Sequence, residues 1–589
     1  MGATENSRPA NDCLLMALGS YHPAAEKLTE FVRRGQISGV GICPDRCCNL
    51  LHERSISASP NRSSFVFSTL DQALSAITAG GLDIHFRQLR RGIEKESLRV
   101  NPDGTLAQTP HPQALGSALT HHSITTDYSE ALLEFVTPIH TDIDGLLREL
   151  TDIHHYTYQN LGDEKLWVNS MPCVVLGEQA IPIARYGSSN IARMKEAYRR
   201  GLGHRYGRLM QTIAGIHYNF SLSDAFWEEY LSTDDPDRLV RERSAGYFAL
   251  TRNFLRHSWL VCYLFGASPA VCKTFLKGRE HDLAEFKEHS FYAPHATSLR
   301  LSGLGYSDDV QATLEICYNS LDEYVATLRR AIQTPWPPYE EIPPIRDGVH
   351  QQLNPNILQI ENEFYAVVRP KQVAHSGESP SSALRDRGVQ YVEVRSLDLD
   401  PFVPIGICSE TVRFFDLFLL YCLFSGDDPL TERERQEATE NRHRVVMGGR
   451  DPGLILQFGE REVTFSGAAL ALLEDMADLA SILDGTCGGE HYREALAAQR
   501  ERIGDPSLTP SARIMDSMEQ GFESFFTFAM HQAEEHERYF KDWEIHANTL
   551  SHYRREAAAS LERQEAIEAA DSASFDEFLA EYFQRQNGY

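Results

Sequence analysis

Two carboxylates, spaced two residues apart in a strand-like segment, most constrain what this chain can form. Residues 90–100 read RRGIEKESLRV, which predicts a β-strand. Side chains alternate between the two faces of a strand, so Glu94 and Glu96 project from the same face. Carboxylates this close repel each other, and a divalent cation bound to their oxygens would relieve the repulsion. For this strand alone, a polar face in water is the competing interpretation.

A second acidic pair follows the first. Residues 125–135 read TTDYSEALLEF and contain Asp127 and Glu134. Glu134 is flanked by apolar residues, and a carboxylate in apolar surroundings is costly unless it is paired or holds a metal. An edge-strand glutamate that faces water is the alternative, and the apolar flanks count against it.

A third segment, residues 390–397, places Glu393 and Arg395 on one face of a predicted strand and valines on the other. A structural salt bridge is one interpretation. Neighbours on the same strand are poorly placed for bidentate pairing, however. The pattern therefore favours a separate ligand for each residue, a metal for Glu393 and a phosphate or carboxylate for Arg395.

The fourth segment, residues 215–222, carries His217 on a face with an asparagine and a serine. A lone histidine is usually structural, and only its polar neighbours on that face favour a site. One sheet with these four polar faces would hold two or more divalent ions, and the carboxylate oxygens favour Mg²⁺ or Mn²⁺ over zinc. The sequence lacks G-x-x-x-x-G-K-[ST], so a nucleotide would be held by metals and basic side chains.

Charge excludes some function classes. The formal net charge of -27 argues against broad binding to nucleic acid or to an anionic membrane. The sequence contains no apolar run long enough to cross a bilayer and no basic and apolar secretion signal at its start. An odd number of cysteines, eleven in a large chain, favours a reducing compartment, and we expect a cytoplasmic protein.

The pattern of predicted elements indicates an α+β fold. Apolar spacing predicts a first helix at residues 70–77. Strands are expected at residues 93–100, 131–137, 215–222, 358–360 and 390–397. Further helices are expected at residues 143–160, 194–210, 245–264, 314–332 and 410–424. This irregular order differs from a repeated βαβ pattern.

We expect three regions along the chain. Residues 1–67 form a weakly ordered N-terminal extension, because Cys43, Cys47 and Cys48 lack the second ligand pair that a zinc site needs. Residues 68–516 form the folded body. Residues 517–589 are helical and charged, and we expect them to pack on that body.

Six motifs in this chain resemble proteobacterial glutamate–cysteine ligase, also called type 1 γ-glutamylcysteine synthetase. They are GIEKESLRV (92–100), HPQALGSALT (111–120), TTDYSEALLEF (125–135), YLFGASPA (263–270), QIENEFY (359–365) and EVRSLD (393–398). The resemblance covers residue 68 to the C-terminus and weakens after about residue 430. It implies a glutamine-synthetase-like catalytic fold, in which an antiparallel sheet forms an open funnel surrounded by helices, and a monomer.

The resemblance also implies roles for individual residues. The metal ligands it implies are Glu94, Glu96, Asp127, Glu134 and Glu393, and His217 is implied as a further metal ligand or a nucleotide-site residue. Arg395 is implied on the transferring phosphoryl group, beside Glu393. The implied substrate-pocket residues are Tyr198, Arg300, Tyr306 and Tyr365. Lys95 and Ser97 should point away from the funnel, because they occupy the other face of their strand.

The activity implied by the resemblance is the ATP-dependent ligation of L-glutamate to L-cysteine, the first step of glutathione biosynthesis. The γ-carboxylate would be activated as γ-glutamyl phosphate, with Mg²⁺ as cofactor and ATP as co-substrate. One alternative is a related carboxylate–amine ligase with a different amine acceptor. Another is a metal- and nucleotide-binding regulatory protein without catalysis, which the complete set of acidic residues disfavours.

Overall fold

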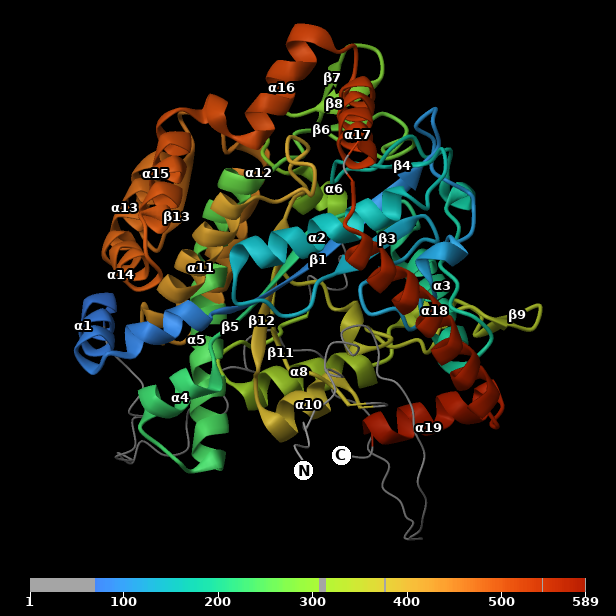
Figure 1. Ribbon diagram of the computed structural model, residues 1–589, viewed down its shortest axis with the longest axis horizontal. Helices are drawn as coiled ribbons and strands as arrows, with labels where there is room; N and C mark the ends of the chain where they lie inside the picture. The colour runs from blue at the N-terminus through green and yellow to red at the C-terminus, as the bar shows by residue number, and fades with distance from the viewer. Residues whose placement is uncertain (1–68, 307–313, 376–377, 543, 588–589) are drawn as a thin grey trace, which may run out of the picture.

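The computed structural model describes residues 69–306, 314–375, 378–542 and 544–587 (Figure 1). The predicted N-terminal extension and its cysteines therefore lie outside the described residues. No helix in the described part of the chain combines the length and apolar character needed to cross a bilayer.

An antiparallel sheet surrounded by helices forms the centre of the molecule (Figure 1). Its strands run in the order β11-β12-β5-β1-β3-β2, and β4 pairs with the far end of β1. Their bounds are β1 Arg90–Val100, β2 Ile124–Thr126, β3 Leu132–Val136, β4 Lys165–Leu166, β5 Ile216–Ser221, β11 Val368–Lys371 and β12 Tyr391–Leu397. The α+β prediction is confirmed.

Three smaller sheets lie outside this central one. Strands β6, β8 and β7 form one of them, β9 and β10 form a hairpin, and β13 and β14 form another. Their bounds are β6 Ala270–Cys272, β7 Ala284–Phe286, β8 Ser290–Tyr292, β9 Ile345–Arg346, β10 Val349–His350, β13 Ile455–Phe458 and β14 Arg461–Thr464.

The register of the central sheet brings distant parts of the chain opposite each other. Glu94 on β1 faces His217 on β5, and Glu96 faces Glu134 on β3. Directly opposed residues of an antiparallel pair project from the same side of the sheet. The face that carries Glu94 therefore carries the polar residues of β3 and β5 as well.

The edge strand β11 extends this face by one more row. Arg369 on β11 is directly opposite Glu393 on β12. Pro370 is compatible with β11 because an edge strand leaves one row of backbone amides outside the ladder. Between Val394 and Leu397 the pairing of β12 with β5 shifts register, so Arg395 lies in an irregular stretch where a bulge can re-aim its side chain.

Helices pack around the sheet, and α2 and α11 lie against the face that bears Tyr218 and Lys95. Tyr218 donates a hydrogen bond to Asp416 of α11, and Lys95 contacts His154 of α2. The helices of the first half are α1 Leu70–Gly80, α2 Ile143–Tyr158, α3 Asn190–Tyr206, α4 Asp224–Leu231, α5 Pro236–Phe265, α6 Gly303–Tyr306, α8 Leu321–Gln333, α9 Pro337–Glu340 and α10 Pro380–Arg387. Those that follow are α11 Ser409–Phe424, α12 Glu432–Gly448, α13 Phe465–Asp475, α14 Ala477–Cys487, α15 His491–Gly504 and α16 Pro510–Gly521.

Three C-terminal helices cover one side of the molecule (Figure 1). They are α17 Phe525–Asp542, α18 Ala547–Ala570 and α19 Phe575–Asn587. Phe540 and Tyr553 belong to the same hydrophobic cluster as Leu74 and Leu133 of the body. On α19, Phe575 and Leu579 pack against Met194 and Ala197 of α3. These helices are therefore part of the packed molecule.

Capping residues explain where the predicted and observed helices differ. The prediction at residues 194–210 corresponds to α3, which begins at Asn190 because the Ser189 side chain caps the Ala192 N–H. The prediction at residues 314–332 corresponds to α8, which begins only at Leu321, where Ser320 caps the Glu323 N–H.

The predicted strand at residues 358–360 is wrong. Leu358, Gln359 and Ile360 are all buried and form a loop that precedes a short 3-10 helix. Gln359 donates its backbone N–H to the Glu363 carboxylate rather than to a neighbouring strand. Glu361 and Glu363, which follow this loop, are both buried as well.

Candidate active site

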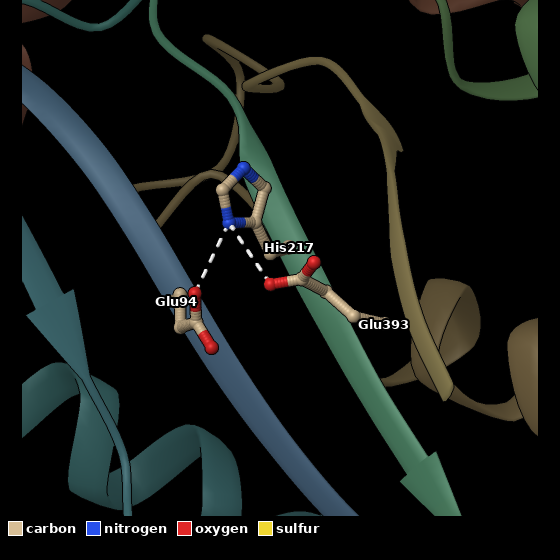
Figure 2. Close-up of side chains that lie close together, drawn as sticks. All are labelled: Glu94, His217 and Glu393. Carbon is tan, nitrogen blue, oxygen red and sulfur yellow. Dashed lines mark hydrogen bonds and ion pairs between the residues drawn. The ribbon is translucent and has the colours of Figure 1, made fainter. Parts of the chain in front are cut away.

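Three side chains from three adjacent strands converge on one face of the sheet. They are Glu94 of β1, His217 of β5 and Glu393 of β12 (Figure 2). His217 Nδ1 lies 3.1 Å from Glu94 Oε2 and 3.9 Å from Glu393 Oε1. One ligand atom from each residue lies within 4.8 Å of the other two, which is a spacing that one metal ion could bridge. We call these residues the triad.

A second group of carboxylates lies beside the triad. Glu96 is directly opposite Glu134 across β1 and β3, and both carboxylates interact electrostatically with Asp127, which follows β2. Burial raises the pKa of Glu134 well above its ordinary value, and the negative charges of Asp127 and Glu94 raise it further. Burial likewise raises the pKa of Glu96, against the opposing effect of His217.

Hydrogen bonds orient one carboxylate of the triad and one of the second group. Asn219 donates Nδ2–H to Glu94 Oε1 at 2.8 Å, and the Gly215 N–H donates to Glu96 Oε2 at 2.7 Å. Each carboxylate keeps lone pairs for a further ligand, because an ionised carboxylate offers about four acceptor positions.

Cations flank the triad on the Glu393 side. Lys371 Nζ lies 3.3 Å from Glu393 Oε1, and Arg395 Nη1 lies 3.4 Å from Glu393 Oε2. Burial alone would raise the pKa of Glu393, but Lys371 and Arg395 hold it well below its ordinary value. Glu393 is therefore ionised at neutral pH although only 1 % of it is exposed.

A cavity of about 450 Å³ opens beside these groups. Glu96, Asp127 and Arg395 line it at the sheet. Tyr198 and Arg199 of α3 line another wall. Acidic residues and arginines line the same cavity, which suits ligands that carry both cationic and anionic groups.

The predicted substrate-pocket residues occupy different places. Tyr198 and Tyr365 line the cavity. Arg300 is buried behind Arg395, whose backbone carbonyl accepts a hydrogen bond from Arg300 Nη2 at 2.8 Å. A side chain at Gly215 would collide with this guanidinium, which explains the glycine there. Tyr306 ends α6, and its side chain lies outside the described part of the structure.

Lys95 and Ser97 point away from the site, as predicted. Lys95 Nζ lies 2.9 Å from Ser97 Oγ and 2.8 Å from His154 Nε2, beneath α2. Burial lowers the pKa of Lys95 to about 7. The two faces of β1 thus present different chemistry although both are buried.

Several residues at the site were not assigned individual roles from the sequence. Lys371 and Arg369 come from an edge strand that the sequence pattern did not reveal, and Arg199 follows the predicted Tyr198 on α3. Asn219 shares the strand face of His217, and that alternation was its only signal.

The donor set suits a hard divalent cation. The triad supplies two carboxylates and an imidazole, and the second group supplies three more carboxylates. Carboxylate oxygens, which make up most of the donor set, favour Mg²⁺ and Mn²⁺. Such an arrangement can neutralise a polyphosphate beside an acidic substrate.

Known sequences similar to this chain agree with one another. The protein-family model described as glutamate-cysteine ligase matches residues 74–445. A glutamate–cysteine ligase of Alcanivorax borkumensis is 50% identical over 520 residues, which cover 87% of this chain and 99% of the relative. One from Pseudomonas paraeruginosa is 51% identical over 492 residues, covering 83% of this chain and 93% of the relative.

Two solved structures are also similar. A glutamate–cysteine ligase of Francisella tularensis in complex with AMP superposes with a TM-score of 0.80 at 36% identity, covering 85% of this chain and 98% of that chain. A bifunctional glutathione synthetase from Pasteurella multocida has a TM-score of 0.64 at 25% identity, covering 87% of this chain and 58% of that chain.

Proposed function

This chain belongs to the glutamate–cysteine ligase family, and from this premise we infer how its site works. It catalyses the ATP-dependent formation of γ-glutamylcysteine from L-glutamate and L-cysteine, the first step of glutathione synthesis. A ligase with another amine acceptor is not favoured, because the relatives that match nearly full length share one name.

The observation that carries the site assignment is the convergence of Glu94, His217 and Glu393 beside Arg395 at the edge of the cavity. An ionised cluster of this kind is unfavourable in a protein interior unless cations complete it. Its retention next to a cavity therefore supports a catalytic role rather than a structural one.

We propose that the triad holds one divalent ion and that Glu96, Asp127 and Glu134 hold at least one more, with Mg²⁺ or Mn²⁺ as the ion. When bound, these ions supply neutralising charge for the triphosphate and the γ-carboxylate. Asn219 and the Gly215 N–H orient Glu94 and Glu96, respectively. Such supporting hydrogen bonds fix a ligand's geometry before the metal arrives.

The reaction that this geometry supports has two steps. A γ-carboxylate oxygen of glutamate attacks the γ-phosphorus of ATP, which forms γ-glutamyl phosphate and releases ADP. The amine of cysteine then attacks the acyl carbon, phosphate leaves with the bonding electron pair, and the nitrogen loses a proton. Arg395 stabilises the charge that spreads over the phosphoryl oxygens, because its guanidinium is partly buried, ionised and beside the triad.

The cavity binds the amino-acid substrates in this proposal. Tyr198 and Tyr365 form part of its wall. Arg300 contributes from behind by holding the backbone of Arg395, so we assign it a positioning role. Tyr306 remains a predicted pocket residue.

The direct test is an ADP-release assay with Mg²⁺, ATP and glutamate, followed by product analysis with and without cysteine. We expect γ-glutamylcysteine and ADP in equal amounts, with turnover that depends on cysteine and on the divalent ion. Product formed with another amine but not with cysteine would contradict the substrate assignment. Full turnover in the presence of a chelator would contradict the metal assignment.

Four proposals concern the organisation of the chain and its oligomeric state. We propose that residues 68–516 form the catalytic unit and that residues 517–589 act as a helical segment packed on it. We further propose a glutamine-synthetase-like funnel for the central sheet and a monomeric enzyme. Light scattering at micromolar concentration tests the oligomeric state. A measured mass of twice that of the chain would contradict the proposed monomer.

A further inference from the structure

Arg369 is a buried arginine that forms no ion pair with a carboxylate among the described residues, although the charge of Glu393 on the neighbouring strand acts on it. Only 8 % of it is exposed. Nη2 donates to the Asn362 backbone carbonyl at 3.2 Å, while Nε is buried without an acceptor. Arginine stays charged under all ordinary conditions, so a poorly satisfied guanidinium in this position carries a desolvation penalty.

Other buried arginines in the molecule differ from it. Arg91, Arg99 and Arg205 each form an ion pair with a buried carboxylate, at 2.7 Å, 2.6 Å and 2.9 Å. Arg252 lacks a carboxylate partner but donates to four backbone carbonyls. Arg369 has neither arrangement among the described residues.

The position of Arg369 indicates which kind of ligand could bind its guanidinium. Its register opposite Glu393 places it on the face of the triad, one strand further out, and it lines the cavity. Asn362, Tyr198 and Tyr365 line the cavity around it. Burial lowers the pKa of Arg369, the positive charge of Arg395 lowers it further, and Glu393 offsets only part of this, so an anion in the cavity would stabilise the guanidinium.

The substrates of the proposed reaction supply suitable anions. Glutamate and cysteine each carry an α-carboxylate that does not react. These carboxylates must be held in place while the γ-carboxylate of glutamate and the amine of cysteine react. A guanidinium binds a carboxylate through two parallel hydrogen bonds, which fixes orientation as well as affinity. Arg369 lies on the side of Glu393 that faces away from Glu94, where Tyr198, Asn362 and Tyr365 line the same cavity.

We propose that Arg369 is a substrate-binding residue that holds the α-carboxylate of an amino-acid substrate in the cavity. This inference rests on the proposed function. The carboxylate comes either from glutamate or from cysteine, and kinetics with each substrate distinguishes the two sources.

The test compares wild-type protein with Arg369→Met and Arg369→Lys. We expect Arg369→Met to raise KM for one amino acid roughly 10- to 100-fold, the range for a lost hydrogen bond to a charged group, with KM for ATP little changed. Arg369→Lys keeps the charge but loses the planar guanidinium, so its KM should lie between those of wild type and Arg369→Met. Arg252→Met is the matched control, because it removes a buried guanidinium that does not line the cavity.

Substrate analogues give a readout that a purely structural role would not change. L-Cysteinamide and isoglutamine lack the α-carboxylate of cysteine and glutamate, respectively. Wild-type protein should strongly prefer the natural acid over its amide, and Arg369→Met should lose most of that preference for one of the two substrates. Arg369→Lys should retain part of it, so the test still works if the methionine variant does not fold.

Two results would overturn the inference. One is unchanged acid-over-amide preference for both substrates in variants that fold. The other is a KM effect confined to ATP, which would assign Arg369 to a phosphate. Wild-type turnover in the same assay separates these failures from a failure of the proposed function, since that function requires wild-type protein to make γ-glutamylcysteine.

Discussion

The two faces of β1 are both buried, and both carry charged side chains, yet they satisfy those charges differently. On the face toward α2 and α11, Arg91 and Arg99 each have a carboxylate partner, Asp416 and Glu164. On the opposite face, Glu94 and Glu96 share their surroundings with further acidic groups. A buried charge that finds its partner within the protein is structural, whereas one that lacks it indicates a site for an external ligand.

The largest effect should come from breaking the satisfied face. Asp416 accepts hydrogen bonds from Arg91, Tyr218 and Tyr492. Asp416→Ala leaves the Arg91 guanidinium buried without its partner, and we expect a loss of about 3–5 kcal/mol in the free energy of unfolding. Denaturant titration measures it.

At a temperature where the Asp416→Ala variant is folded, its KM values should remain close to those of wild-type protein. A free energy of unfolding equal to that of wild type would show that the ion pair of Arg91 with Asp416 does not stabilise the fold.

Substitutions on the face that carries Glu94 should reduce activity and leave the fold intact. We expect Glu393→Gln or Glu94→Gln to lower kcat by at least about 100-fold, equivalent to about 2.7 kcal/mol of transition-state stabilisation, without loss of the fold. Steady-state kinetics and circular dichroism check the two parts.

Glu361→Gln is the matched control, because Glu361 is equally buried but bonded to the backbone N–H of Ser381. It should lose stability and keep most of its turnover. Wild-type turnover in Glu393→Gln or Glu94→Gln would remove these residues from the metal site.

A third prediction concerns pH and metal removal. The folded-state pKa of Glu134 is raised, so between the unfolded-state and folded-state pKa values the folded protein binds more protons than the unfolded chain. Its contribution to stability therefore falls as pH rises through this window. In metal-free protein we expect Glu134→Gln to be more stable than wild type by about 1 kcal/mol or more at pH 8, with the difference shrinking toward pH 4.5.

Mg²⁺ should stabilise wild-type protein more than Glu134→Gln, since the ion binds the folded state through this carboxylate. Thermal unfolding with EDTA and with Mg²⁺ at several pH values provides the measurement. Equal stabilisation of both proteins by Mg²⁺ would place the ion elsewhere.

The smallest effect should come from removing the residues that precede the family match. The family match begins at residue 74, and we expect removal of residues 1–67 to change kcat and KM by less than about twofold. Kinetics of the truncated protein checks this. A large loss of activity would show that the extension takes part in the reaction.

Much of the site was predictable because strand alternation is local. The sequence predicted that Glu94 and Glu96 share a face, that Glu393 and Arg395 do so, and that Lys95 points the other way. The structure brings Glu94, His217 and Glu393 together as a candidate metal site, while the metal itself stays a prediction. The loop at residues 358–360 was misjudged because its three buried residues follow no strand period.

The sequence by itself determined which side chains share a face, since the two-residue period of a strand is set by the backbone of that strand alone. Only the tertiary structure decided that β5 lies beside β1 and β12 beside β5, which brings distant residues within reach of one ion. It also decided which charges find partners, because Asp416 and Glu164 come from elements far along the chain. Partnership between buried charges is a non-local property, and for Arg369 it is the absence of an ion pair among the described residues that indicates a function.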